Sequence, residues 1–184
     1  MRDISLIAFD ADDTLWECQT YFASVEKDYC GLLKHYAPAG DISQALFATE
    51  TANMELLGYG SKAFILSLLE NATHVSDGKL TSAEVAAIIK MGKSLLQLPG
   101  KPLERVEETL QELRKSGLYK MVVFTKGELL DQESKFKRSG LRDCFDDIVV
   151  VSDKTPAAYE RLCKQYGIGI EQLLMVGNSF KSDV

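Results

Sequence analysis

Four short apolar runs, each ending at a polar residue or a glycine, constrain the fold of this chain more than any other feature. The runs occupy residues 6–9, 121–124, 148–151 and 173–176. Continuous apolar runs of this length are typical of strands in a parallel sheet with both faces covered. A helix-like segment precedes each of the last three runs, at residues 102–116, 128–138 and 156–166. The alternation predicts an α/β fold with a doubly wound parallel sheet and a ligand site at the carboxyl ends of its strands.

The segment between the first two runs has a different pattern and predicts only helices. Four are expected, separated by turns that contain glycine, at residues 20–36, 42–57, 61–71 and 82–96. Thr81 and Glu84 form the capping-box pattern at the start of the last one. We therefore expect two domains. One is a discontinuous core of residues 1–16 and 100–184, and the other is a helical domain of residues 17–99.

Size and charge exclude several classes of protein. The 184 residues are enough for one sizeable core with a small second domain. A formal net charge of -6 lacks the general positive field that binds nucleic acid or anionic membranes. No apolar stretch approaches the length of a membrane span, and the first run is too short for a signal peptide. The four cysteines are irregularly spaced and form no CxxC pair, so we expect reduced thiols in a cytoplasmic protein.

The most informative segment is DADDT at residues 10–14, which places three carboxylates directly after the first apolar run. Negative charge at the end of a buried strand is costly unless a cation compensates it. A solvated turn rich in aspartate is the ordinary alternative. The functional interpretation is a Mg²⁺ site in which Asp10 binds the metal and attacks phosphorus, while Asp12 serves as acid and base.

This segment resembles the first motif, DxDxT, of the haloacid dehalogenase-like (HAD) hydrolases, and Asp10, Asp12 and Thr14 match it. The resemblance extends along the whole chain. The second, third and fourth motifs are matched by Thr125, Lys154 and residues 177–183. It implies a Rossmann-like three-layer core with a parallel sheet and a small all-helical cap, whose position between the first two strands is that of a C1 cap.

The resemblance also implies a chemistry and a set of site residues. Asp10 would become an aspartyl phosphate, and Asp12 would protonate the leaving oxygen and later activate water. The substrate phosphoryl group would be held by Thr14, Thr125, Lys126 and Lys154. Mg²⁺ would be bound by Asp10, the backbone carbonyl of Asp12, Asn178 and Asp183.

Some of these residues have ordinary alternatives. Thr125 alone could cap the following helix, and Lys154 alone could be a solvated lysine. Asn178 stands where the family more often has Asp, and its amide oxygen carries no charge. We therefore expect weaker metal binding or a larger role for Asp183.

Asp12 favours phosphate ester chemistry within the family, because dehalogenases lack this acid. The expected substrate is a small phosphorylated metabolite, either a nucleotide or a sugar phosphate, with no nucleic-acid or membrane partner. A phosphosugar mutase and a catalytically weak phospho-ligand-binding protein remain alternatives, as do a monomer and a homodimer. Candidate cap selectors near the loops are Tyr21, Phe22, Tyr59, Ser61 and Lys62, with packing in the cap interior as the ordinary alternative for the first two.

The sequence stops one residue after Asp183. Members of the family normally continue past the fourth motif with a helix, a strand and a final helix. We therefore expect a truncated chain whose sheet lacks its last strand.

Overall fold

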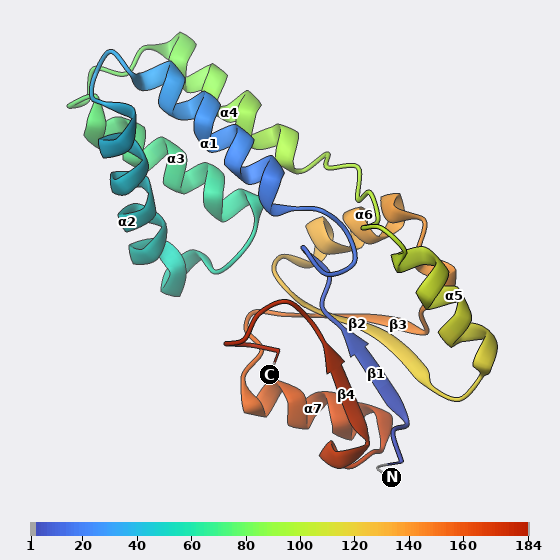
Figure 1. Cartoon of the computed structure of the whole chain (residues 1–184). Coiled ribbons are helices and arrows are strands. Elements are labelled where there is room, and N and C mark those ends of the chain that lie inside the picture. Colours follow the sequence, from blue (N-terminus) through green and yellow to red (C-terminus); the bar gives the residue numbers. More distant parts are fainter. Residues whose placement is uncertain (1–2, 184) are drawn as a thin grey trace. The chain divides into compact units, whose positions relative to one another are not determined.

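The computed structural model describes residues 3–183 (Figure 1). They fall into two compact units. An α/β unit comprises the described parts of Met1–Cys18 and Pro99–Val184, and a helical unit comprises Gln19–Leu98. Within residues 3–183, no helix has the length and apolar character needed to cross a membrane.

The α/β unit is built on four parallel strands in the order β3-β2-β1-β4. They are β1 (Leu6–Phe9), β2 (Lys120–Lys126), β3 (Asp147–Val151) and β4 (Leu173–Val176). Leu6 at the start of β1 pairs with Lys120 on one side and with Leu173 on the other. The predicted parallel α/β sheet is therefore confirmed, and β1 lies inside it. Because the strands are parallel, their carboxyl ends meet at one edge, where the polar residues that follow them come together.

Helices cover both faces of this sheet, which makes three layers (Figure 1). The helices are α5 (Val106–Ser116), α6 (Leu129–Ser139) and α7 (Pro156–Tyr166), with short 3-10 turns at Arg142–Cys144 and Ile170–Gln172. Side chains alternate along each strand. Ile7 and Phe9 therefore pack with α5 and α6, whereas Leu6 and Ala8 pack with α7 on the opposite face.

The helix α5 begins later than the sequence pattern predicts. It starts at Val106 instead of residue 102, because Arg105 has a left-handed backbone (φ 64) and Pro102 forms an antiparallel bridge with Trp16. A left-handed residue cannot continue a right-handed helix.

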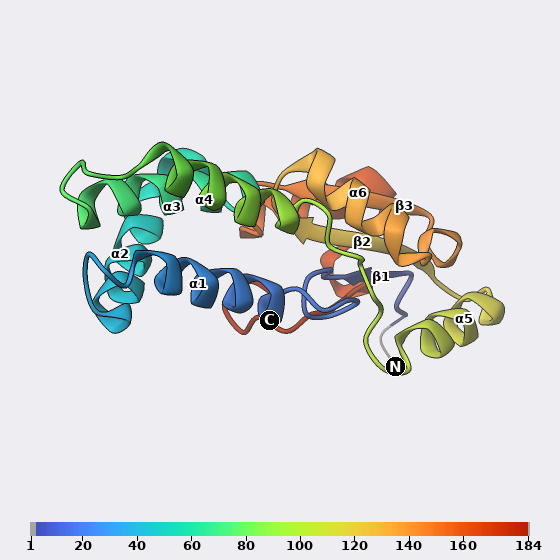
Figure 2. The same cartoon turned by 90° about the horizontal axis from the view of Figure 1, so that it is seen from above.

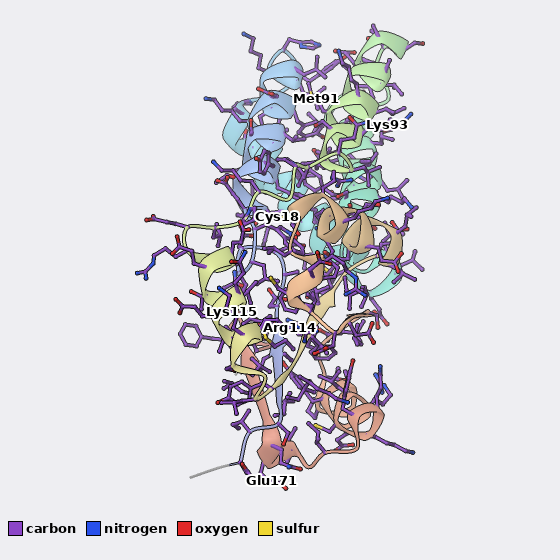
Figure 3. The ribbon with its side chains drawn as sticks, turned by 90° about the vertical axis from the view of Figure 1, so that its right-hand side faces the viewer. Cys18, Met91, Lys93, Arg114, Lys115 and Glu171 are labelled. Atoms are coloured by element: carbon purple, nitrogen blue, oxygen red, sulfur yellow. The ribbon has the colours of Figure 1, made fainter. Side chains whose placement is uncertain are left out.

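At the other end of α5, Arg114, labelled in Figure 3, donates to the Asp146 carboxylate at 2.7 Å. This contact ties the end of α5 to the segment before β3.

The helical unit contains the four expected helices (Figure 2). They are α1 (Gln19–Leu33), α2 (Ala39–Leu57), α3 (Ser61–Val75) and α4 (Ser82–Leu95). Each packs against two others, so that α2 contacts α1 and α3, and α4 contacts α3 and α1. The predicted capping box is confirmed, since Glu84 N–H donates to the Thr81 hydroxyl and Thr81 N–H donates to the Glu84 carboxylate. Inside, the buried Tyr29 hydroxyl donates to Asn71 Oδ1 at 2.6 Å.

Candidate active site

A compact turn after β1 places Asp10 and Asp12. The Leu15 N–H donates to the Ala11 carbonyl at 2.8 Å, and the Asp13 N–H donates to the Trp16 carbonyl at 2.8 Å. Asp13 has a left-handed backbone (φ 58), which aspartate tolerates better than most residues. Ala11, between the two aspartates, is fully buried in the core. The turn thus leaves Asp10 and Asp12 at the carboxyl edge of the sheet.

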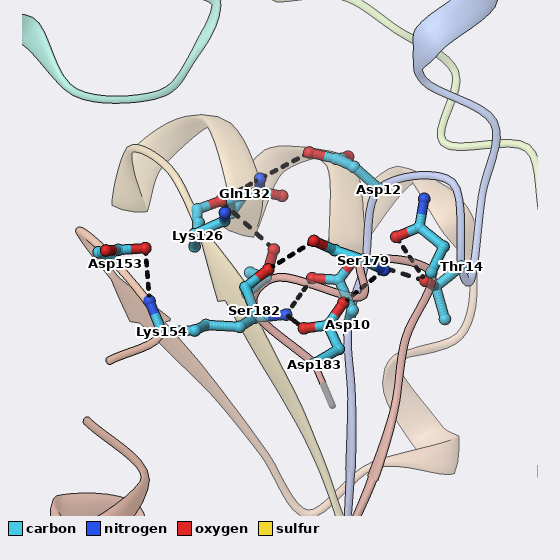
Figure 4. A network of polar contacts seen from close by, with 12 residues as sticks. Asp10, Asp12, Thr14, Lys126, Gln132, Asp153, Lys154, Ser179, Ser182 and Asp183 are labelled. Carbon is cyan, nitrogen blue, oxygen red and sulfur yellow. Dashed lines mark hydrogen bonds and ion pairs between the residues drawn. The ribbon is translucent and has the colours of Figure 1, made fainter. Parts of the chain in front are cut away.

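Asp10 shares a buried cation with Asp183 (Figure 4). The Lys154 ammonium donates to Asp10 Oδ1 at 2.5 Å and to Asp183 Oδ1 at 2.6 Å. All three residues are buried, and Lys154 is only 5% exposed. Burial raises the pKa of Asp10 and the Asp183 charge adds to the rise, although Lys154 offsets part of it. Lys154 is therefore buried against Asp10 and Asp183 and is not a solvated lysine.

The loop after β4 brings Asn178 and Asp183 to Asp10. The single proton of the Thr14 hydroxyl is shared between Asp10 Oδ2 and Asn178 Oδ1, each 3.4 Å from the hydroxyl oxygen. Asp183 Oδ2 accepts from the Ser179 N–H at 3.0 Å. Gly177 makes room for this arrangement, because a Cβ there would collide with the Asp183 carboxyl group.

The donor set around Asp10 fits a hard cation. It consists of the Asp10 and Asp183 carboxylates and the Asn178 amide oxygen, and oxygen donors are those that Mg²⁺ prefers. Within residues 3–183 no three His, Cys, Asp or Glu side chains are grouped to hold a metal. The set therefore relies on the amide oxygen of Asn178 and on a main-chain or water oxygen for further ligands.

Asp12 has a separate set of partners (Figure 4). Its two carboxylate oxygens both accept from the Lys135 ammonium at 2.8 Å. Oδ1 also accepts from Trp16 Nε1, and Oδ2 from Gln132 Nε2, each at 2.8 Å. Burial alone would raise the pKa of Asp12, but the Lys135 charge and these hydrogen bonds lower it below its usual value. Asp12 is thus held as a carboxylate.

Thr125 and Lys126 lie at the carboxyl end of β2, beside the end of β1. Thr125 is 1% exposed, and its hydroxyl donates to the Lys126 carbonyl at 3.3 Å. The N-cap position of α6 belongs to Glu128, so Thr125 does not cap that helix. The Lys126 carbonyl also accepts from Gln132 Nε2 at 2.9 Å.

The sequence analysis did not predict two residues that contact Asp12, namely Gln132 and Lys135. Both lie on the buried side of α6, near Phe136. The available signal was a glutamine and a lysine three residues apart on the same side of a helix as an aromatic residue, since a buried lysine needs an anionic partner.

The candidate selectors belong to the helical unit and are described only within it. Phe22 packs against Phe64 in a tilted arrangement with ring centroids 5.1 Å apart, which favours its packing alternative. Ser61 is buried at the start of α3.

Comparison with solved structures shows how widely this architecture occurs. A haloacid dehalogenase-like family hydrolase from Xanthomonas campestris matches with a TM-score of 0.93 and 36% identity, over 99% of this chain and 76% of that one. HAD-hydrolase YfnB from Bacillus subtilis, bound to magnesium, matches with a TM-score of 0.69 and 15% identity, over 98% and 82%. A predicted phosphoglycolate phosphatase from Haemophilus somnus 129pt matches with a TM-score of 0.63 and 20% identity, over 99% and 80%.

L-2-haloacid dehalogenases are also among the matching structures, at 16 to 18% identity. These more distant likenesses show the fold alone. Among curated protein sequences, no match to this chain is found. The family model for haloacid dehalogenase-like hydrolases matches residues 4–184, nearly the whole sequence. Together with the 36% identical hydrolase, this match shows that the chain belongs to the haloacid dehalogenase-like hydrolase family.

Proposed function

We propose that this chain is a Mg²⁺-dependent phosphomonoester hydrolase that acts through an aspartyl phosphate on Asp10. The observation that carries the proposal is the pair of aspartates two residues apart, each held by its own lysine: Asp10 by Lys154 and Asp12 by Lys135. Ester hydrolysis needs both a nucleophile and a separate acid and base, because the leaving oxygen requires a proton. A halide leaves without one, so Asp12 favours the phosphatase over the dehalogenase.

In the first step an Asp10 oxygen attacks phosphorus, and the bond between phosphorus and the ester oxygen breaks. The departing alkoxide needs a proton, and Asp12, which is ionised in the protein without substrate, would first take up a proton from solvent and then pass it to that oxygen. Lys154 lies against Asp10 and would neutralise charge on the phosphoryl oxygens, a task shared with Lys126 and the Thr125 hydroxyl. Thr14 would keep Asp10 in its attacking orientation through the contact to Oδ2.

In the second step water attacks the phosphorus of the aspartyl phosphate. Asp12 now accepts a proton from that water, and the bond from phosphorus to the Asp10 oxygen breaks. The products are inorganic phosphate and the regenerated Asp10 carboxylate. The ionised state of Asp12 described above suits this base role.

The residues that would hold Mg²⁺ are Asp10, Asp183, Asn178 and, through its carbonyl, Asp12. When bound, the ion would supply positive charge that reduces the repulsion between the phosphate and the carboxylate nucleophile. The magnesium in the YfnB structure lends support to this choice of metal. The substrate would be a small phosphorylated metabolite, such as a nucleotide or a sugar phosphate. The four buried cysteines form no disulfide, which is in keeping with a cytoplasmic enzyme.

The test is turnover of p-nitrophenyl phosphate with and without Mg²⁺. Wild type should release inorganic phosphate only with the metal, and Asp10→Asn should abolish release. Asp13→Asn is the matched control, because Asp13 lies in the same turn and asparagine also tolerates its left-handed backbone. Inactive wild type, or activity that survives in Asp10→Asn, would refute the mechanism. Transfer of phosphate between sugar positions without release would indicate a mutase.

A further inference from the structure

The Asp12 carboxylate is fixed from three directions by groups outside the motifs that identify the family. Lys135 contacts both of its oxygens, Gln132 contacts one and Trp16 contacts the other. In Figure 4 Asp12 turns toward Gln132, whereas Asp10 turns toward Lys154. The α6 clamp, defined here as Gln132 and Lys135, therefore governs the direction of Asp12 but not that of Asp10.

The amide of Gln132 has one possible orientation. Its Nε2 lies 2.8 Å from Asp12 Oδ2 and 2.9 Å from the Lys126 carbonyl, and both of these atoms are acceptors. The amide nitrogen must face them, which leaves Oε1 buried with no hydrogen-bond partner among residues 3–183. An unpaired buried acceptor is costly. This cost is explained if the amide nitrogen has the task of directing Asp12.

Lys135 adds a charge that serves Asp12. It is 3% exposed, and a lysine so buried is stabilised only by an anionic partner. Burial alone would lower the pKa of Lys135, yet the Asp12 charge raises it. Because the ammonium bonds both Asp12 oxygens, rotation of that carboxylate breaks at least one contact.

We propose that Lys135 and Gln132 are positioning residues that hold the Asp12 carboxylate in the direction required for proton transfer to the leaving group. The inference rests on the proposed function, in which Asp12 is the acid and base. Neither residue of the α6 clamp touches the nucleophile in any contact described above, so both act through Asp12. Loss of the clamp should therefore weaken leaving-group protonation selectively.

The leaving group provides the discriminating measurement. A p-nitrophenolate departs readily without a proton, whereas an alkoxide does not. For Lys135→Met we expect kcat/KM to fall by about 10 to 100-fold with alkyl phosphates and by less than about fivefold with p-nitrophenyl phosphate. Gln132→Leu should show the same selectivity between the two classes of ester, with a smaller loss of kcat/KM. Lys137→Met, at an exposed position on the same helix, is the control and should change neither value.

A double-mutant cycle separates positioning from a general structural effect. If Lys135 acts through Asp12, adding Lys135→Met to Asp12→Asn should cause no further loss with either class of ester. The emission of Trp16, the single tryptophan of the chain, gives a readout without turnover, because its indole N–H donates to Asp12. We expect the emission to change in Lys135→Met and in Asp12→Asn, but not in Lys137→Met.

The outcomes are distinguishable. Equal losses for both classes of ester, or additive losses in the cycle, would overturn the positioning role while leaving the phosphatase intact. Absence of turnover by wild type with every ester would refute the proposed function itself. If Lys135→Met fails to fold, Gln132→Leu carries the same comparison, and an unselective loss in that variant would overturn the proposal.

Discussion

The two units of the molecule bury different kinds of polar groups. Among residues 3–183, the buried charged side chains all lie in the α/β unit: Asp10, Asp131, Lys135, Lys154 and Asp183. The buried polar side chains of the helical unit are neutral: Ser61, Ser67, Asn71 and Ser76. Because burial of charge rarely adds net stability, its concentration in one unit supports the location of the proposed active site in that unit.

Within the α/β unit, the pKa values of the two motif aspartates shift in opposite directions. The pKa of Asp12 lies below the ordinary value of 3.8, so its ion pair adds stability above that pH, and this is lost as pH falls through the folded-state pKa. The pKa of Asp10 is raised, so its ionisation removes stability as pH rises from 3.8 through the folded-state pKa. One aspartate thus favours the folded state as a carboxylate, and the other as an acid.

Removing a buried charge from the α/β unit should have the largest effect. Lys154→Met leaves the Asp10 and Asp183 carboxylates buried without their shared cation, which we expect to cost about 3 to 5 kcal/mol of unfolding free energy at pH 7. Urea denaturation measures the loss, with Lys164→Met on exposed α7 surface as the control. Added Mg²⁺ should restore part of the stability, since the same two carboxylates would gain a cation. A loss no larger than that of the control would contradict the comparison.

A second change tests how firmly α6 is held. Gly100 and Gly117 have the same left-handed φ of 64, but a Cβ at Gly100 would lie 2.7 Å from the Lys135 carbonyl, whereas Gly117 has open space. Gly117→Ala should cost about 1 kcal/mol from backbone strain alone, and Gly100→Ala about 2 to 3 kcal/mol. Thermal denaturation of both variants isolates the crowding. Equal shifts in Tm would show that the backbone near Gly100 can move to accommodate the added Cβ at no cost.

In the helical unit, removal of a neutral buried hydrogen bond should have a smaller effect. Tyr29→Phe deletes the hydroxyl whose single proton is shared between Asn71 Oδ1 and the Leu68 carbonyl, at a cost of about 1 to 2 kcal/mol. Because these groups are uncharged between pH 5 and 8, the loss should be constant over that range. Denaturation at the two ends of the range is the measurement. A loss that varied with pH would mean that a charge is coupled to this interior.

The smallest expected effect concerns Glu50, a half-buried residue on α2. Burial and the nearby Glu26 charge raise the pKa of Glu50 to about 6. Ionisation therefore removes stability as pH rises from 4.5 through about 6, and Glu50→Gln should raise stability at pH 7.5 by about 0.5 kcal/mol once solvent screening is allowed for. At pH 4.5 the variant and wild type should coincide. Glu55→Gln, at an exposed position of the same helix, should show no such difference.

Much of the fold could be predicted because its signals are local. Each strand is a continuous apolar run, and Thr81 with Glu84 marks a helix start within four residues. The predicted start of α5 was wrong because the bridge between Pro102 and Trp16 depends on chain segments far apart in sequence. The spacing of apolar residues around 102–105 does not indicate that contact.

The candidate site divides in the same way. Asp10 and Asp12 follow directly from one strand, so their proximity was predictable. Gln132 and Lys135 reach Asp12 only because α6 packs in the same core cluster as Ala11 and Leu15 of that turn. Nothing in the spacing of α6 residues indicates which carboxylate its lysine meets, and pairing of this kind is decided by tertiary packing.

The central position of β1 has a consequence for the order of folding. Its partners start at Lys120 and Leu173, so the first strand made has no local strand to pair with. Closing such long loops is entropically slow. The helical unit is one continuous segment with contacts between successive helices. It can therefore form before β1 has paired with its neighbouring strands. We therefore expect amide protection in pulse-labelled refolding to appear first in α1 to α4 and last in β1.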